Sequence, residues 1–277
     1  VILSWELIKD KAVYFTGSPT AYQFQTQCQV TSNPYTGVTG TYGLLNCLAI
    51  QNGGLWAVIR FYFQPNTSGN LLGFQNRPAN ASSSNGDPWL NVSSNRVWIT
   101  DIVVGAWFQL SLDLSVGWHT VIAGQYYSGS TCYQFLALDT PSNYATQSFS
   151  AYNRLAGAGG PYPYSIIGNL YSTFGAPNVV GLGFTGPVQY IAIYGGNSPS
   201  IQSTLLRWLQ QTGGKALPPT ISGAGPYALF IPIGLASNGA TWRDMSGNGN
   251  DVALGAVIGA PYVPAPYYLV LLRVSDT

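Results

Sequence analysis

Hydrophobic residues recur along the chain in short runs, and turns rich in Gly, Pro, Asn and Ser separate one run from the next. The runs are enriched in Val, Ile, Thr and aromatic residues, which is typical of β-strands. We therefore predict an all-β, antiparallel sandwich, with loops over 66–88 and 144–164. The strand-like runs are 1–11, 12–24, 44–65, 89–114, 118–139, 165–169, 184–194, 228–260 and 266–277.

One stretch, residues 198–211, follows a helical period instead. Ser198 can cap its first turn and Pro199 fits the first helical position. Apolar residues recur there at the spacing of one helix face: Ile201, Leu205, Leu206 and Leu209. The sequence therefore predicts one short helix late in the sandwich.

Residues 212–226 are rich in Gly and Pro, which is typical of a linker. Strand-like sequence resumes after them. The chain is thus divided into a body over 1–211, a linker over 212–226 and a C-terminal strand segment over 227–277.

The C-terminal segment carries the most distinctive motif. Residues 244–254 read D-x-S-G-N-G-N-D-x-x-L, between two apolar runs. This stretch resembles the opening strand pair of a laminin-G-like domain, of the concanavalin A-like jelly-roll family. Residues 118–121 (W-H-x-V), the run at 184–194 and the helix at 198–211 also resemble that family. The resemblance implies a jelly roll whose opening strands stand at the C-terminus.

Such a displacement leaves two arrangements open. The linker can fold back, so that the segment completes its own sandwich as a circular permutation. Alternatively, the segment can complete a neighbouring copy, which propagates into a head-to-tail homopolymer. We favour this exchange because the linker is long, has little reason to lie flat on its own domain, and the apolar runs at 1–8 and 267–274 would pair across the junction. The residues expected to mediate assembly are Tyr227, Leu229, Phe230, Ile231, Val252, Leu254, Tyr268, Leu269, Val270 and Leu271.

The charge is low: 7% of residues are charged and the formal net charge is +1. The sequence therefore has no excess of positive charge that would attract nucleic acid. Weak electrostatic repulsion between copies of the protein favours self-association. No apolar run is long enough to span a bilayer.

An extracellular location is expected from two features. The sequence begins at Val1, as a secreted protein can after its signal is removed. Three N-glycosylation sequons, at Asn66, Asn80 and Asn91, fall in what we expect to be loops.

Three cysteines are present. Cys28 and Cys47 fall in neighbouring strand-like runs, so we expect a disulfide between adjacent strands, with Cys132 free. The alternative is three small buried thiols.

Catalysis is not expected. His119 is the only histidine and Glu6 the only glutamate, and the acidic residues are scattered rather than paired. Serine-type and glycosidase sites need closer groupings.

Calcium is the one candidate cofactor. Asp244, Asn248, Asn250 and Asp251 offer oxygen ligands within one turn, and related lectin domains bind calcium through such loops. An Asx-rich turn that satisfies its own backbone is the favoured alternative. Asp87 and Asp101 are looser candidates.

The sequence thus predicts a secreted structural protein that polymerises into an extracellular filament by donor-strand exchange. The alternative is a carbohydrate-binding module with a permuted fold, whose partners would be glycans.

Overall fold

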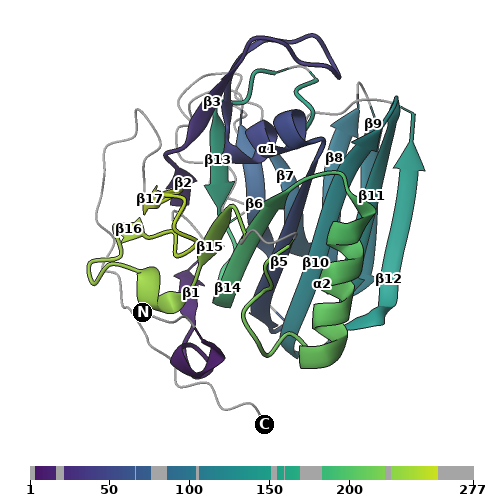
Figure 1. Cartoon of the computed structure of the whole chain (residues 1–277). Coiled ribbons are helices and arrows are strands. Elements are labelled where there is room, and N and C mark those ends of the chain that lie inside the picture. The colour runs from purple at the N-terminus through teal and green to yellow at the C-terminus, as the bar shows by residue number, and fades with distance from the viewer. Residues whose placement is uncertain are drawn as a thin grey trace.

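The computed structural model describes residues 4–16, 22–65, 67–75, 86–103, 106–150, 155–158, 160–168, 183–221 and 226–254. Two sheets face each other and form a sandwich (Figure 1). Sheet A contains, in order, β1 (Val13–Thr16), β14 (Thr185–Gly195), β5 (Gly54–Phe63), β10 (Gly117–Ser128), β11 (Thr131–Leu138) and β12 (Thr140–Phe149), and β15 (Ala228–Phe230) also pairs with β14. Sheet B contains, in order, β16 (Thr241–Trp242), β17 (Val252–Leu254), β2 (Tyr22–Phe24), β13 (Tyr164–Ile167), β6 (Gly69–Gln75), β7 (Gly86–Ser93), β8 (Arg96–Val103) and β9 (Ala106–Asp113).

Neighbouring strands within both sheets are antiparallel. A separate hairpin joins β3 (Gln27–Val30) to β4 (Gly40–Gly43). The predicted fold class, an all-β antiparallel jelly-roll sandwich, is confirmed.

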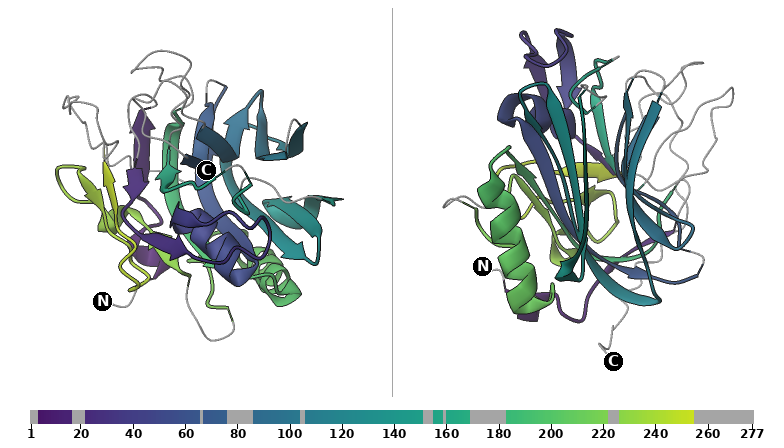
Figure 2. Two further views of the ribbon diagram at one scale, coloured as in Figure 1. Left: turned by 90° about the horizontal axis from the view of Figure 1, so that it is seen from above. Right: turned by 90° about the vertical axis from the view of Figure 1, so that its right-hand side faces the viewer.

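The main core lies between the two sheets, and a second core lies on the outer face of sheet A (Figure 2). The central strand β5 separates them and is buried on both faces, which explains its nearly continuous apolar sequence. Gly124 on β10 makes room for this packing, because a Cβ there would lie 2.3 Å from the ring of Trp56.

The helix α2 (Pro199–Thr212) covers the outer face of sheet A, as the sequence predicts (Figure 1). The Ser198 hydroxyl caps it by accepting a hydrogen bond from the Ser200 amide at 3.3 Å. Ile201, Leu205 and Leu209 are buried as expected, and Trp208 joins them.

A second helix was not predicted. Residues 44–52, expected to be a strand, form α1 (Leu44–Asn52), which ends at Gly53 with a left-handed φ of 75°. All residues from 44 to 50 are buried, so no polar face reveals a helical period. Short apolar runs of this kind do not distinguish helix from strand.

Two further expectations were wrong. Residues 1–11 were expected to be a strand, but the described part forms a 3-10 turn, η1 (Trp5–Leu7), folded onto its own sandwich with Ile8 buried. The expected loop over 144–164 begins inside strand β12. That strand has few apolar residues because its outer face is exposed to solvent, so its sequence resembles a loop.

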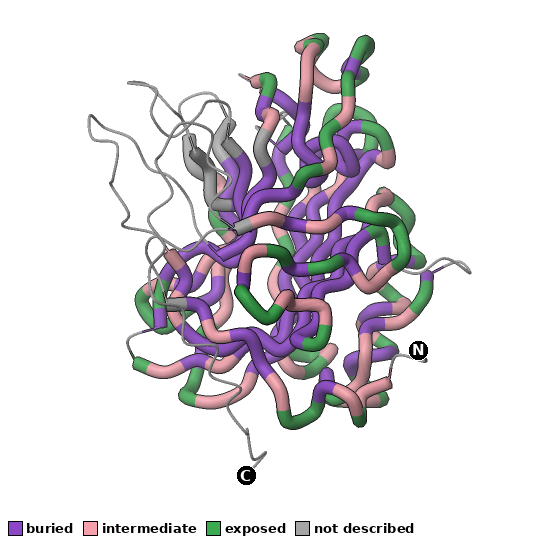
Figure 3. The backbone as a smooth tube through the Cα atoms, turned by 90° about the vertical axis from the view of Figure 1, so that its left-hand side faces the viewer, coloured by how far each residue is buried: buried purple, intermediate pink, exposed green. Residues whose placement is uncertain are grey.

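The described part of the C-terminal segment, up to Leu254, pairs with its own chain. Ile191 of β14 is in register with Phe230 of β15, and Phe24 of β2 is in register with Val252 of β17. A 3-10 turn, η2 (Pro232–Gly234), joins β15 to the β16–β17 hairpin. Figure 3 views this side of the molecule, where buried positions continue into these strands.

The expected linker also lies on its own domain. The Tyr190 hydroxyl donates to the Gly214 carbonyl at 2.9 Å, and the Tyr194 hydroxyl donates to the Pro219 carbonyl at 2.8 Å. Ile221 is buried in the second core. The sequence did not reveal these anchors, because they are tyrosines on a distant strand.

A disulfide joins Cys28 of β3 to Cys47, with a Cα–Cα distance of 6.0 Å, and Cys132 is a free, buried thiol. Cys47 lies on α1 rather than on a strand, so the bond fastens the β3–β4 hairpin to the helix.

Replacing both Cys28 and Cys47 with serine should lower the free energy of unfolding by about 3 kcal/mol, because a loop of about 19 residues is released in the unfolded chain. Equilibrium denaturation of oxidised wild type and of the double variant measures this.

Labelling of the denatured, unreduced wild type should modify Cys132 alone; three labelled cysteines would contradict the pairing.

Candidate functional site

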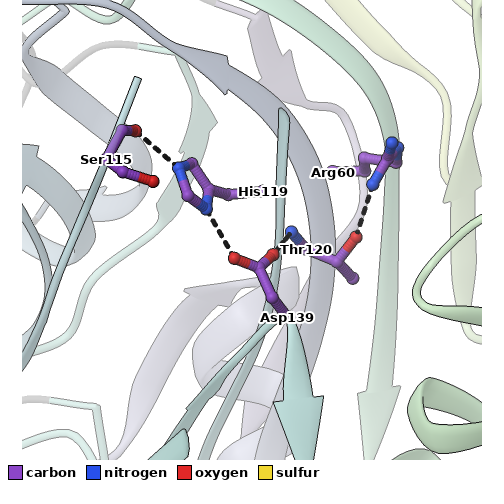
Figure 4. A network of polar contacts seen from close by, with 5 residues as sticks. All are labelled: Arg60, Ser115, His119, Thr120 and Asp139. Carbon is purple, nitrogen blue, oxygen red and sulfur yellow. Dashed lines mark hydrogen bonds and ion pairs between the residues drawn. The ribbon is translucent and has the colours of Figure 1, made fainter. Parts of the chain in front are cut away.

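The most concentrated polar cluster on sheet A surrounds His119, near the start of β10 (Figure 4). Its Nδ1 lies 2.6 Å from Asp139 Oδ2, and its Nε2 lies 2.7 Å from the Ser115 carbonyl oxygen. The other oxygen of Asp139 accepts a hydrogen bond from the Thr120 amide at 2.7 Å. Asp139 adopts a φ of 62°, which turns its carboxylate back toward β10.

Both ring nitrogens of His119 face oxygen atoms that can accept a hydrogen bond, an arrangement that favours the imidazolium form. Burial lowers the pKa of His119, but the hydrogen bonds to Asp139 and to the Ser115 carbonyl raise it further, so the net pKa is above its ordinary value. A general base needs a free ring nitrogen that faces a nucleophile. Both nitrogens of His119 are engaged in this structure, and their hydrogen bonds hold the β11–β12 turn and Ser115 against β10.

Replacing His119 with alanine should therefore destabilise the protein in a pH-dependent way. The raised pKa means that the ion pair contributes fully below the unfolded value near pH 6.5 and is lost as the pH rises through the folded value. We expect a cost of about 1–3 kcal/mol at pH 5.5 and a smaller cost at pH 9.5. Urea denaturation at both pH values measures it.

Ser115→Ala is the control for this measurement, because Ser115 contacts the imidazole only through its backbone carbonyl. An equal cost of His119→Ala at both pH values would show that the histidine carries no charge in the folded protein.

Arg60 extends the cluster across β5. Its Nη1 donates to Thr120 Oγ1 at 3.1 Å, and its Nε donates to Gln189 Oε1 at 2.9 Å. Its guanidinium lies 5.9 Å from the ring centroid of Trp5 and 5.4 Å from that of Trp118. These contacts hold η1 against sheet A, so the buried arginine has a structural role in fixing the N-terminal residues.

A second polar network is buried between the sheets. Gln125 accepts from Trp89 Nε1 at 3.3 Å and from Gln134 Nε2 at 2.9 Å, and it donates to Asp101 Oδ2 at 2.7 Å. Gln147 on β12 in turn donates to Gln134. This ladder of hydrogen bonds therefore runs from the fully buried carboxylate of Asp101 to Gln147 at the edge of sheet A. Asp101 thus belongs to the core and is not a loop ligand for a cation.

The candidate calcium turn uses its oxygens internally. The carboxylate of Asp244 accepts hydrogen bonds from the amides of Leu229, Ser246 and Asn250 and from the Ser246 hydroxyl. One oxygen of Asp251 accepts from the Asp244 amide at 2.8 Å. A cation at Asp244 would have to displace several of these bonds, so the geometry favours the alternative of a self-satisfied turn.

The two amides of this turn point toward the linker. Asn248 Nδ2 donates to the Pro226 carbonyl at 3.1 Å, and Asn250 Nδ2 donates to the Tyr227 carbonyl at 2.6 Å. The Asn250 side-chain oxygen accepts from Thr26 Oγ1 at 2.8 Å. Within the described part of the chain, no group of three His, Cys, Asp or Glu side chains could hold a metal ion. Calcium binding at this turn stays a prediction.

The three sequons lie in different structural environments. Asn66 and Asn80 lie outside the described residues. Asn91 lies in β7 rather than in a loop, is half-buried, and donates from Nδ2 to Thr100 Oγ1 at 3.0 Å. A glycan on Asn91 would be attached at this engaged nitrogen.

The expected assembly residues divide into two groups. Leu229, Phe230, Ile231 and Val252 are buried in their own chain, Tyr227 is exposed, and Leu254 pairs with Tyr22 in register. The remaining four, Tyr268, Leu269, Val270 and Leu271, lie outside the described residues.

On the opposite side of the sandwich each sheet ends in an edge strand, counting only the strands that the structure describes. β12 ends sheet A and β9 ends sheet B, and the two strands lie against each other (Figure 2). The side chains of Phe108 and Phe149 stack there with ring centroids 4.1 Å apart. The sequence did not predict this edge because the part of β12 from Tyr144 onward was expected to be a loop. Exposed Tyr144, Thr146 and Ser148 alternate with Ala145, Gln147 and Phe149, and the polar Gln147 hides this period-two pattern.

The outer face of sheet A also carries a row of tyrosines. The rings of Tyr126 and Tyr133 stack at 5.1 Å, and Tyr144 stacks on Phe135 at 6.0 Å. Tyr126 and Tyr133 are half-buried, whereas Tyr144 is 56% exposed.

No protein-family model and no curated protein matches the chain. Among solved structures, it is similar to a heptameric SAP-like pentraxin from Limulus polyphemus, with 15% identity and a TM-score of 0.41 over 72% of this chain and 82% of the pentraxin. It is also similar to the CBM40 of the IT-sialidase from Ruminococcus gnavus, with 12% identity and a TM-score of 0.46 over 76% of this chain and 100% of that one. Likenesses at this level identify neither a ligand nor an activity. Among the described residues, no helix is long and apolar enough to cross a membrane.

Proposed function

We propose that the protein is an extracellular structural protein whose copies associate head to tail into a filament. The observation that supports this proposal is the edge strand β12 of sheet A, which among the described residues pairs with β11 alone. β12 is a strand of 10 residues, and over Thr140–Phe149 it contains no Lys, Arg, Asp or Glu. Natural sheets commonly protect such edges with charge, proline or bulges, because exposed N–H and C=O groups pair with other strands. β12 has a proline, Pro141, and a register shift opposite Ala137 and Leu138, both near its start, so the rest of the strand carries none of these features.

The part of the assembly hypothesis that concerned residues 228–254 gets no support from the geometry. Those residues fill their own sandwich, and the linker before them is anchored on its own sheet. Assembly through β12 needs no such exchange, because in the described part of the chain residues 228–254 pair with their own strands and no strand pairs with the outer edge of β12. The disulfide fits an oxidising compartment, and the low net charge does little to keep copies apart.

The test is a pair of lysine variants. Thr146→Lys with Ser148→Lys adds two charges to the exposed face of β12, and we expect it to abolish assembly while the thermal midpoint changes little. Gln210→Lys with Gln211→Lys adds the same charge to the exposed face of α2 and should assemble like wild type. Light scattering after gel filtration and electron microscopy report the state of each.

A monodisperse wild-type monomer at high concentration would overturn the proposal. The second candidate, a carbohydrate-binding module, would then take its place. The observation that favours this candidate is the tyrosine row, since partly exposed rings present flat apolar faces with a polar tip. Glycan-array binding that is lost in Tyr144→Ala would support it.

A further inference from the structure

We infer that Asn248 is a site of spontaneous covalent modification, where the side-chain amide is hydrolysed through a cyclic imide formed with Gly249. This inference does not depend on the proposed assembly. Asn-Gly pairs undergo the reaction because glycine has no side chain to hinder the attack of its amide nitrogen. The sequence contains such pairs at Asn52, Asn85, Asn238 and Asn248, and Asn85 lies outside the described residues. The structure distinguishes the other three.

The reaction consumes water and no other reagent. The Gly249 nitrogen forms a bond to Cγ of Asn248 and loses its proton, while the side-chain nitrogen of Asn248 gains a proton and leaves as ammonia. Water then opens the imide at either of its carbonyl carbons. One opening restores the normal main chain with a side-chain carboxylate. The other leaves an isoaspartyl linkage, which adds a methylene group to the main chain.

Both reacting groups of the Asn248–Gly249 pair are accessible. Both residues are exposed. Within the described part of the chain, the Gly249 amide donates no hydrogen bond and Asn248 Oδ1 accepts none. A Cβ at Gly247 or Gly249 would meet no atom within 4 Å, so the main chain has room for the change in dihedral angles that ring closure requires.

Only the leaving nitrogen of Asn248 is engaged. Its Nδ2 donates to the Pro226 carbonyl at 3.1 Å and to the Tyr227 carbonyl at 3.2 Å. These bonds lie at the surface, where water can replace the amide as the donor. They therefore slow the reaction less than a bond to the attacking nitrogen would.

The Asn238–Gly239 pair has the attacking nitrogen bonded instead. Gly239 is buried, and its amide donates to the Ala236 carbonyl at 2.8 Å. Asn238 Oδ1 accepts from the Ala240 amide at 3.0 Å, which also holds the side chain in place. Ring closure at Asn238 thus requires both bonds to break.

The Asn52–Gly53 pair is restrained by packing. Asn52 is the last residue of α1, and Gly53 is buried. A Cβ at Gly53 would lie 2.8 Å from the Asn197 side chain, so the main chain has little room to rearrange. Of the three described pairs, Asn248–Gly249 is therefore the reactive one.

Hydrolysis at Asn248 removes a fastening of the linker. The product has no side-chain N–H to donate to the carbonyls of Pro226 and Tyr227, and its carboxylate would face their oxygen atoms. Tyr227 directly precedes β15, so the start of that strand loses support.

The isoaspartyl product also disturbs the bonds of Asp244. The Asp244 carboxylate accepts from the amides of Ser246 and Asn250, which lie on either side of Asn248 in the chain, and from the amide of Leu229 on β15. An extra methylene group between Ser246 and Asn250 changes the distance between their amides. The carboxylate then loses the fit that lets it hold the turn and β15 together.

The test is peptide mapping by mass spectrometry after incubation of the folded, full-length protein at mildly alkaline pH, which favours deprotonation of the attacking amide. We expect the Asn248 peptide to gain one mass unit at least about tenfold faster than the Asn52 and Asn238 peptides, because their contacts must first break. In guanidinium the three should react at similar rates, since each is then a solvated Asn-Gly pair. Similar rates in the folded protein, or a slower reaction at Asn248, would overturn the inference.

Hydrogen exchange measures the consequence for β15. After incubation, the Leu229 amide of wild type should exchange at least about tenfold faster than in a fresh sample. Asn248→Gln should show no such change between fresh and incubated samples, because a glutamine side chain forms the corresponding larger ring far more slowly. A mass gain at Asn248 with unchanged exchange at Leu229 would overturn the loosening of β15.

Discussion

Replacement of Trp242 with alanine is expected to lower the free energy of unfolding by about 3–5 kcal/mol, one of the two largest effects that we predict for a single residue. Trp242 is fully buried on β16 and contacts the rings of Phe15, Tyr22 and Phe230. Its Nε1 donates to the Ile231 carbonyl at 2.8 Å. The substitution thus opens a large cavity and leaves a buried carbonyl without this donor.

The reason for choosing Trp242 is that its neighbours come from both ends of the chain. Phe15 and Tyr22 belong to the N-terminal strands, whereas Phe230 belongs to β15. Guanidinium denaturation gives the cost, and Tyr227→Ala, at an exposed position in the same segment, should cost less than about 1 kcal/mol. Equal small costs at both positions would contradict the packing of the C-terminal segment in the sandwich.

The same variant separates the two ways of filling the sandwich. If residues 228–254 complete their own chain, the unfolding midpoint is independent of protein concentration. If a neighbour supplies them, dilution lowers the midpoint by mass action. We expect independence, measured over a hundredfold range of concentration for wild type and Trp242→Ala in the monomeric Thr146→Lys/Ser148→Lys background.

Replacement of Gln125 with leucine is expected to cost about 2–4 kcal/mol, because it breaks a buried polar network at its centre. Gln125 bonds with Trp89, Gln134 and Asp101, all of which are buried. Leucine has a similar volume but no polar atoms, so the Asp101 carboxylate loses a donor in a region without access to water. A buried acceptor that loses a donor carries a desolvation penalty.

Gln147→Leu is the matched control for Gln125→Leu. Gln147 is the outermost member of the same ladder and is half-buried, so water can replace its bond to Gln134. We expect a cost below about 1 kcal/mol by urea denaturation. If both substitutions cost the same, the network does not stabilise the core cooperatively.

The polar networks around His119 and Gln125 depend on contacts that the sequence does not predict. His119 is visible in the sequence as the only histidine, but its pKa depends on Asp139, which the β11–β12 turn brings to it, and on the Ser115 carbonyl from the β9–β10 loop. Gln125 and Asp101 lie 24 residues apart and meet only because β10 and β8 belong to facing sheets. No local pattern encodes such a contact, since it depends on how two sheets are stacked.

The sequence by itself determined the all-β class, the helix at 198–211 and most of the strands. These features arise from local causes: side-chain alternation, capping by Ser198 and turn chemistry. It did not determine α1, because residues 44–50 are all buried and show no polar face. It did not determine the strand β12 either, because the polar residues on its exposed face are also typical of a loop. In both cases the environment, rather than the local sequence, sets the pattern.

Only the tertiary structure shows residues 228–254 paired with strands of their own chain. The sequence left self-completion and exchange open, because both satisfy the same backbone groups and bury the same side chains. Hydrogen bonds from Tyr190 and Tyr194 place the linker on its own sheet, and the ring of Trp242 joins the two ends of one chain. Such long-range contacts are absent from any local window of sequence, so the choice between the two arrangements depends on the packed sandwich.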